Sequence, residues 1–224
     1  MKAAFSGMSL EPVSPNSTLD FVPWPRSFFS PSADVVAPLL LGHFLIRQAP
    51  GGPCGGIIVE TEAYLADDPA CHAFRGETER NRAMFGPPGH AYVYFIYGNH
   101  HCVNAVCRPQ GHGEAVLIRA IEAGFGLQAM RARRAVANPH QLTNGPGKLC
   151  EALDIKRELD GTDLCDVDSR LMVARNPDRD KLLADRGPVV TAPRVGITKA
   201  AEWPLRFCLV GSPCVSRKPP RRAG

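Results

Sequence analysis

Aromatic and acidic side chains gather in one part of this 224-residue chain. All four tyrosines lie between positions 64 and 97, and three of them fall in the segment 92–98, Tyr-Val-Tyr-Phe-Ile-Tyr-Gly. The acidic run 59–64, Val-Glu-Thr-Glu-Ala-Tyr, precedes that segment. Aromatic rings hold unstacked nucleobases, and a nearby carboxylate is the group that cleaves a glycosidic bond. The pattern indicates a stretch suited both to binding a base and to reacting with its nucleoside.

The acidic run is typical of a β-strand, which determines how its side chains point. A strand over 56–64 places alternate residues on opposite faces of the sheet. Glu60, Glu62 and Tyr64 then share one face, so a carboxylate and a phenol ring point the same way. Glu60 is the rival of Glu62 for any acid–base role.

The tyrosine segment predicts one arm of a β-hairpin. A strand runs through Tyr97, a turn follows at 98–99, and a return strand covers 101–107. Tyr92 and Tyr94 share a face, whereas Tyr97, at the end of the strand, points to the opposite side. One tyrosine can therefore line a pocket while another projects from the turn. The alternative is that these rings are ordinary strand aromatics packed in a core.

The rest of the chain alternates short helical and strand patterns. Ser32 can cap the first helix, Pro38 limits or kinks it, and Gly42 is a natural stop. Together the segments fit an α+β fold with a single mixed domain and a mainly antiparallel sheet. The expected helices cover 33–41, 78–85, 126–136 and 147–153, and the further strands cover 43–48, 115–121, 194–197 and 205–210.

The two ends differ from the centre of the chain. Residues 1–30 carry four prolines among serines and are expected to form an irregular N-terminal arm, and residues 217–224 form a short basic tail. The domain between them covers 31–216. The first residues are too polar for a signal peptide, so we expect a cytoplasmic protein, associated with the nucleoid if the source is bacterial.

Composition limits the possible partners and cofactors. No apolar run approaches the roughly 18 residues that span a bilayer, so no membrane association is expected. The 26 basic and 22 acidic residues permit a polyanionic partner without requiring one. Eight cysteines occur without a Cys-x-x-Cys or His-x-x-x-His spacing, so we expect core thiols and no metal or other cofactor.

Eight motifs stand in order along the chain. They are Glu-Thr-Glu-Ala-Tyr (60–64), Asp-Pro-Ala-Cys-His (68–72), Arg-Asn-Arg-Ala-Met-Phe (80–85), the tyrosine segment (92–98), Val-Asn (103–104), Val-Leu-Ile-Arg-Ala (116–120), Gly-Pro-Gly-Lys-Leu (145–149) and Arg-Val-Gly (194–196). From about residue 33 to about 216, the chain resembles the alkyladenine DNA glycosylases, the 3-methyladenine DNA glycosylase type of mammals and many bacteria. The resemblance implies a curved sheet surrounded by helices, with a protruding hairpin that wedges into DNA.

The same resemblance implies a reaction. Such enzymes swing an alkylated or deaminated purine out of double-stranded DNA and hydrolyse its bond to deoxyribose, leaving an abasic site. Glu62 matches the catalytic acid residue that activates a water, and Arg119 matches the arginine beside that water. No lysine lies near Glu62 in the sequence, so a monofunctional enzyme without lyase activity is expected. It is expected to act as a monomer.

Further residues match the positions that hold the base and the DNA. Tyr64, His72 and Tyr94 match the residues that sandwich the extruded base, and Asn104 matches the one that excludes the amino group of normal guanine. Tyr97 matches the wedge that fills the gap left by the flipped nucleotide. The positions that match phosphate contacts are Thr78, Arg80, Gly147 and Lys148.

One segment departs from the family pattern, and two other functions stay open. Asn99, His100 and His101 replace the methionine and aromatic residue common beside the wedge tyrosine. A catalytically silent nucleic-acid binding module would keep Tyr97 but tolerate loss of Glu62. A hydrolase of free nucleosides or glycosides would need no wedge.

Overall fold

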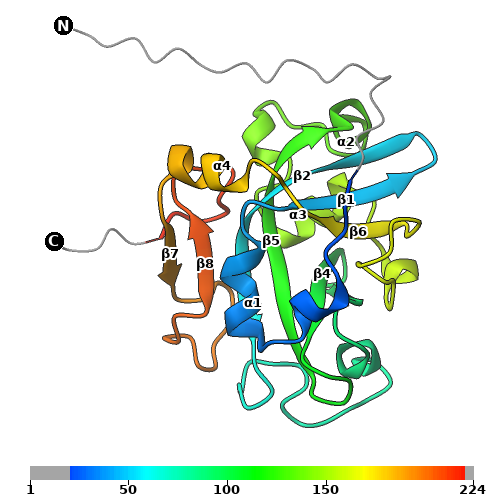
Figure 1. The fold of residues 1–224 in the computed structure, drawn as a ribbon, viewed down its shortest axis with the longest axis vertical. Helices are drawn as coiled ribbons and strands as arrows, with labels where there is room; N and C mark the ends of the chain where they lie inside the picture. Colours follow the sequence, from blue (N-terminus) through cyan, green and yellow to red (C-terminus); the bar gives the residue numbers. More distant parts are fainter. Residues whose placement is uncertain (1–20, 220–224) are drawn as a thin grey trace, which may run out of the picture.

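The computed structural model describes residues 21–219, which form one curled sheet with helices around it (Figure 1). The strand order is β3-β4-β5-β2-β1-β6, with β8 paired to β2 and β7 to β8, and all these pairings are antiparallel. The predicted α+β fold is confirmed.

The strands are β1 (Phe44–Ala49), β2 (Gly52–Tyr64), β3 (Ala91–Ile96), β4 (His100–Cys107), β5 (Glu114–Phe125), β6 (Leu171–Ala174), β7 (Val189–Ala192) and β8 (Arg206–Leu209). The α-helices are α1 (Ala33–Leu40), α2 (Leu127–Arg133), α3 (Pro146–Ala152) and α4 (Arg179–Arg186), and single 3-10 turns cover Arg26–Phe29, Arg82–Phe85, Pro139–Gln141 and Arg157–Leu159.

Strand β2 lies at the centre of the sheet and carries the acidic run. At Glu60–Glu62 it pairs with β5 along one edge and with β8 along the other. Its register against β5 shifts on both sides of Glu60, which marks a bulge in the ladder. Glu60 and Glu62 are fully buried. The predicted shared face is confirmed, because Arg119 contacts both carboxylates and the Tyr64 hydroxyl contacts one of them.

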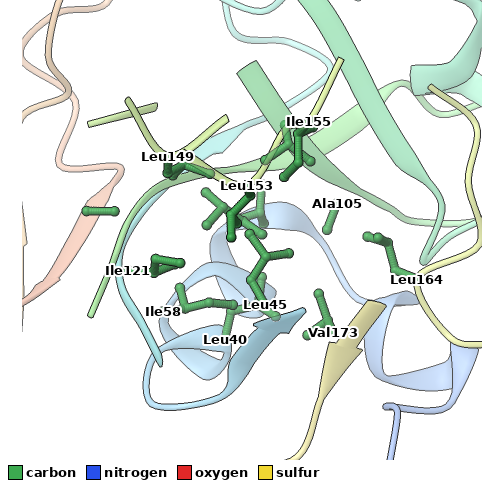
Figure 2. Close-up of a cluster of buried hydrophobic side chains, with 14 of the residues drawn as sticks. Leu40, Leu45, Ile58, Ala105, Ile121, Leu149, Leu153, Ile155, Leu164 and Val173 are labelled. Carbon is green, nitrogen blue, oxygen red and sulfur yellow. The ribbon is translucent and has the colours of Figure 1, made fainter. Parts of the chain in front are cut away.

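A hydrophobic core holds two helices against this sheet. Helix α1 packs on β2 and β5, and α3 packs on β4 and β5. Figure 2 shows Leu40 of α1, Leu45 of β1, Ile58 of β2, and Leu149 and Leu153 around α3 in one cluster. Full burial of such a side chain contributes about 1.5–3 kcal/mol. The packing fixes the strands from which the acids and the tyrosines project.

The first helix begins differently from the prediction. Ser32 does not cap α1 with its side chain, because its hydroxyl donates to the Asp34 carboxylate. The Ser32 carbonyl instead accepts the backbone N–H groups of Val35 and Val36. Pro38 lies inside the helix, which ends two residues later at Leu40.

The helix predicted over 78–85 is wrong, since only Arg82–Phe85 form a 3-10 turn. The side chain of Asn81 provides the reason. Its carbonyl oxygen accepts both the backbone N–H and the hydroxyl of Thr78, and its amide donates to the carbonyls of His72 and Gly76. Such local side-chain bonds compete with helical ones.

The end of the chain departs from the prediction in other ways. Residues 194–197 do not form a strand, and Gly196 has a φ of +79°, which strands do not use. The strand that precedes them is β7, which ends at Ala192. Helix α2 ends at Arg133, because Arg134 is extended. Strand β6 and helix α4 were not among the predicted elements, and α4 has no fully buried residue.

Part of the predicted N-terminal arm packs on the domain. The Phe21 ring contacts Phe44 and Phe125, the Trp24 amide donates to a carbonyl of β6, and Phe29 is fully buried. Residues 21–29 of the expected arm thus contact the domain, whereas 1–20 and 220–224 lie outside the described residues. Within 21–219, no helix is both long and apolar enough to cross a bilayer.

Candidate active site

A cavity of about 280 Å³ opens between the β3–β4 hairpin, the end of β2 and the loop 195–197. Six residues expected from the sequence border it: Tyr64, His72, Tyr94, Tyr97, Asn104 and Arg119. Its wall also contains residues to which sequence reasoning gave no role, namely Ala70, Met84, Tyr92, Ile96, Cys102, Leu117, Pro146, Val195, Gly196 and Ile197. Segments far apart in sequence thus meet around one aromatic pocket.

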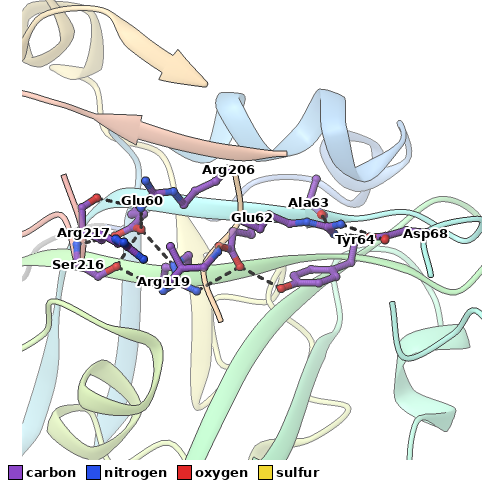
Figure 3. A network of polar contacts seen from close by, with 11 residues as sticks. Glu60, Glu62, Ala63, Tyr64, Asp68, Arg119, Arg206, Ser216 and Arg217 are labelled. Atoms are coloured by element: carbon purple, nitrogen blue, oxygen red, sulfur yellow. Dashed lines mark hydrogen bonds and ion pairs between the residues drawn. The ribbon is translucent and has the colours of Figure 1, made fainter. Parts of the chain in front are cut away.

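Glu62 lies directly behind this wall. Its Oε2 accepts the Tyr64 hydroxyl at 3.0 Å and Arg119 Nη1 at 3.1 Å (Figure 3). Its Oε1 accepts the backbone N–H of Val195 at 2.7 Å. All three donors border the cavity, while Glu62 itself is fully buried. Charge-assisted bonds of this kind are about twice as strong as neutral ones. The carboxylate is therefore held as an acceptor one side chain away from the pocket.

Glu60 occupies a different place from Glu62. Its carboxylate accepts Arg206 Nη1 at 2.9 Å, Arg119 Nε at 3.1 Å, and both the backbone N–H and the hydroxyl of Ser216. Figure 3 shows this group at the end of the network opposite Tyr64. Glu60 thus ties the C-terminal segment to the sheet, and it meets the cavity only through Arg119.

Arg119 joins the two carboxylates. It donates through Nε to Glu60 and through Nη1 to Glu62, and its side chain is only 7% exposed. Burial lowers the pKa of this guanidinium, but Glu62 and then Glu60 outweigh that effect, so the pKa lies above the ordinary value. Arg119 therefore stays cationic beside the pocket.

Tyr64 shows how burial and charge act together. Burial, and then the negative charge of Glu62, raise the pKa of its phenol far above the usual range. The hydroxyl therefore remains a hydrogen-bond donor to Glu62. The guanidinium of Arg194 lies 4.7 Å from the centre of the Tyr64 ring.

His72 and two tyrosines form a second aromatic group that borders the cavity. The His72 ring lies 4.6 Å from Tyr94, edge to face, and its Nδ1 forms a 2.9 Å hydrogen bond with the Tyr92 hydroxyl. Burial, and then Arg80, lower the pKa of His72 below its ordinary value of 6.5, which favours the neutral ring. Tyr92 is almost fully buried and serves to hold His72. Asn104 pairs with Tyr92 across the hairpin and donates its amide to the Tyr92 carbonyl at 2.9 Å.

Tyr97 stands at the tip of the hairpin and is 78% exposed. Its φ of +55° is rare for a residue other than glycine, so the strand alternation stops at Ile96. For that reason the expected opposite orientation is wrong: Tyr97 borders the same cavity as Tyr94.

The residues expected to contact phosphates lie on both sides of the hairpin. Arg80 donates to the Phe95 carbonyl of β3, and Thr78 bonds to Asn81 as described above. On the other side, Lys148 donates to the Asn144 side chain at 2.9 Å, and Gly147 lies under His100. A Cβ on Gly147 would stand 2.9 Å from the His100 Cγ. The departure at 99–101 thus packs the hairpin onto α3.

No group of three or more metal-ligating side chains occurs within residues 21–219, and the eight cysteines are all free thiols there. Burial raises the pKa of Cys71, Cys165, Cys208 and Cys214 to about 12, which keeps these thiols protonated.

Comparison with known proteins bears on this arrangement. The family model described as "Methylpurine-DNA glycosylase (MPG)" matches residues 27–213. The chain belongs to the methylpurine-DNA glycosylase family. It is 50% identical over 194 residues to a protein of Methanoculleus marisnigri (87% of this chain, 98% of the relative) and 51% identical over 192 residues to one of Rhizobium meliloti (85% and 95%). A protein of Nitrosospira multiformis is 49% identical over 193 residues (86% and 93%), and all three are named "Putative 3-methyladenine DNA glycosylase".

The expected DNA glycosylase activity in DNA repair is therefore confirmed at the level of the family. The cavity and the buried carboxylate of this glycosylase lie entirely within the matched residues. Sequence reasoning missed the Val195 amide, the Tyr92 hydroxyl and the anchoring of Glu60 by Arg206. The motif 194–196 was a signal for the first of these, because it belonged to the family pattern but had no assigned task.

Proposed function

We propose that this glycosylase excises alkylated or deaminated purines from double-stranded DNA by using Glu62 to activate a water. The observation that carries the proposal is the placement of Glu62, whose three hydrogen-bond donors, Tyr64, Arg119 and Val195, all border the aromatic cavity. A base held in that cavity brings the C1′ of its sugar toward this wall. Glu60 is disfavoured for the role because two arginines and Ser216 occupy its carboxylate.

The chemistry follows from the charges at this wall. Glu62 takes a proton from water while the water oxygen bonds to C1′, and the C1′–N bond breaks with its electron pair leaving on the purine. The carboxylate also stabilises the positive charge that develops on the sugar. Its Oε1 accepts a single bond, from Val195, and so keeps a lone pair for the water. Arg119 holds Glu62 in place and balances its charge.

The aromatic walls supply the binding energy for the extruded base. Tyr64, His72 and Tyr94 all border the cavity, so a planar base held there stacks against these rings. Stacking contributes roughly 1–3 kcal/mol per base, which offsets much of the few kcal/mol needed for unstacking. Asn104 selects against normal guanine by colliding with its exocyclic amino group.

The hairpin supplies the contact with the duplex. Tyr97, exposed at its tip, fills the space that the base vacates. Thr78 and Arg80 on one side, and Gly147 and Lys148 on the other, bind the phosphates that flank it. Such a surface favours duplex DNA over a free nucleoside or glycoside, and the intact pair of Glu62 and Arg119 favours an enzyme over a silent binding module.

The partner in this proposal is damaged duplex DNA, bound by one copy of the chain. We place the glycosylase in the cytoplasm, at the nucleoid if the cell is bacterial.

The test uses duplex oligonucleotides that carry one hypoxanthine, ethenoadenine or 3-methyladenine, with a chelator present. We expect alkali-labile sites at the lesion and none in the matched undamaged duplex. Deoxyinosine as a free nucleoside should not be hydrolysed at a comparable rate. Tight binding of the lesion duplex without base release would support a silent module, and equal turnover of deoxyinosine would support a nucleoside hydrolase.

A further inference from the structure

Arg194 is a buried arginine behind the cavity wall, and the function proposed above gives it no task. Its side chain is fully buried, and its guanidinium donates one hydrogen bond to each carboxylate oxygen of Asp68, a bidentate contact. Asp68 is also fully buried. It donates further to the carbonyls of Ala63 at 3.0 Å and Ala200 at 3.4 Å. Figure 3 shows Ala63, Tyr64 and Asp68 together at one end of the polar network.

These contacts connect three parts of the pocket. Val195, the next residue, donates to Glu62 Oε1. Asp68 starts the loop that carries His72, because its carbonyl accepts the Cys71 amide and its Oδ1 accepts the Ala70 amide. The guanidinium also lies over the ring of Tyr64, 4.7 Å from its centre. Arg194 is therefore a positioning residue for the wall on which the base is expected to stack.

The guanidinium also acts on the ring electronically. Tyr64 borders the cavity, and the guanidinium of Arg194, which is fully buried and does not border it, lies over the Tyr64 ring. A cation on one face of an aromatic ring draws electron density toward itself, and the other face then attracts a second cation less. Among the described residues, the cation–ring contacts are Arg194 with Tyr64 and Arg175 with Trp24. Tyr94, which also borders the cavity, has no such contact among the described residues.

The effect distinguishes between classes of damaged base. 7-Methylguanine carries a full positive charge, whereas hypoxanthine is neutral. We propose that the Arg194–Asp68 pair sets the preference of the pocket between cationic and neutral purines, because the positive charge of Arg194 weakens the attraction of Tyr64 for a cation and Asp68 limits that effect. The inference rests on the proposed function, in which Tyr64 stacks on the base.

The test compares single-turnover base release from two duplexes that differ only in the lesion, 7-methylguanine or hypoxanthine. The measured quantity is the rate of 7-methylguanine release divided by the rate of hypoxanthine release. This ratio is then divided by the wild-type ratio, so that the different leaving-group qualities of the two bases cancel. Arg194→Met removes the charge and should raise this normalised ratio about fivefold, equivalent to ~1 kcal/mol. Asp68→Asn leaves the arginine charge uncompensated and should lower the ratio by a similar factor. Arg194→Lys keeps the positive charge but cannot form the bidentate contact with Asp68, so both rates should fall and the normalised ratio should stay near one.

Opposite shifts in the first two variants support the proposal, because a purely structural role would move both in the same direction. Shifts of the same sign, or ratios near one in both, would overturn it. If Arg194→Met does not fold, Asp68→Asn alone decides: a lowered ratio supports the proposal and an unchanged or raised one refutes it. Absence of base release by the wild type from either duplex would instead refute the proposed function.

Discussion

Replacing Glu60 by Gln removes a charge that balances two buried arginines. In the polar network of Figure 3, Glu60 and Glu62 face Arg119 and Arg206, so the two negative charges match the two positive ones. Arg206 is 2% exposed, and its ion pair among the described residues is the one with Glu60. In the variant, Arg119 keeps Glu62, but Arg206 is left as an uncompensated buried cation.

The magnitude follows from the cost of that cation. Removing one partner of a buried pair costs about 3–5 kcal/mol, because the remaining charge has lost both water and its partner. A domain is typically stable by about 5–15 kcal/mol, so the free energy of unfolding falls by a large fraction. At about 2–4 °C per kcal/mol for a domain of this size, the melting temperature falls by roughly 6–20 °C.

Guanidinium chloride unfolding followed by far-ultraviolet circular dichroism measures the change. The control is the double variant Glu60→Gln with Arg206→Met, in which both charges are absent. We expect it to be less destabilised than the sum of the two single variants, by about 1–3 kcal/mol. A Glu60→Gln protein within about 1 kcal/mol of the wild type, or additive single variants, would refute the inference that Glu60 anchors this network.

Three further predictions concern the pocket and the hairpin. Tyr97→Ala should slow single-turnover release from duplex DNA by about tenfold while leaving release from a single strand unchanged, and an unaltered duplex rate would exclude the wedge. Arg80→Gln should raise the pKa of His72 toward 6.5, measured by NMR titration of its ring protons, because Arg80 lowers that pKa after burial does. The pKa of His72 is lower in the folded state than in the unfolded state, so its neutral ring stabilises the fold above pH 6.5, and this stabilisation is lost as the pH falls. The loss of stability should be smaller in Arg80→Gln. An unchanged pKa of His72 in that variant would contradict the prediction. Gly147→Ala should destabilise the protein by about 1–3 kcal/mol through the clash with His100, and His100→Ala in the same chain should restore most of the loss in a thermal melt; no rescue would contradict the contact.

The sequence predicted those parts of the site that depend on the alternation of side chains along a single strand. Glu60, Glu62 and Tyr64 share a face because alternation along one strand requires it. The hairpin of β3 and β4 followed in the same way from two strand patterns around a glycine turn. The family motifs supplied the positions that border the cavity, including His72 and Arg119.

Contacts between distant segments could not be predicted from local patterns. Val195 reaches Glu62 across 133 positions, and Ser216 reaches Glu60 across 156, so no local pattern reveals either bond. Single side chains also overrode local propensity. Asn81 replaced an expected helix with a turn, and the positive φ of Tyr97 brought that ring to the cavity instead of the far side.

The most direct test of the account is the rate of Glu62→Gln on a hypoxanthine duplex under single-turnover conditions, measured together with binding of the same duplex. Glutamine keeps the shape and the Oε1 acceptor for Val195 but cannot take a proton from water. The matched control is Glu122→Gln, because the Glu122 carboxylate on β5 pairs with Arg186 and does not border the cavity. We predict that Glu62→Gln lowers the rate at least about 10²-fold with binding retained, while the control releases base at the wild-type rate. Base release by Glu62→Gln at the wild-type rate would contradict the assignment of the catalytic carboxylate.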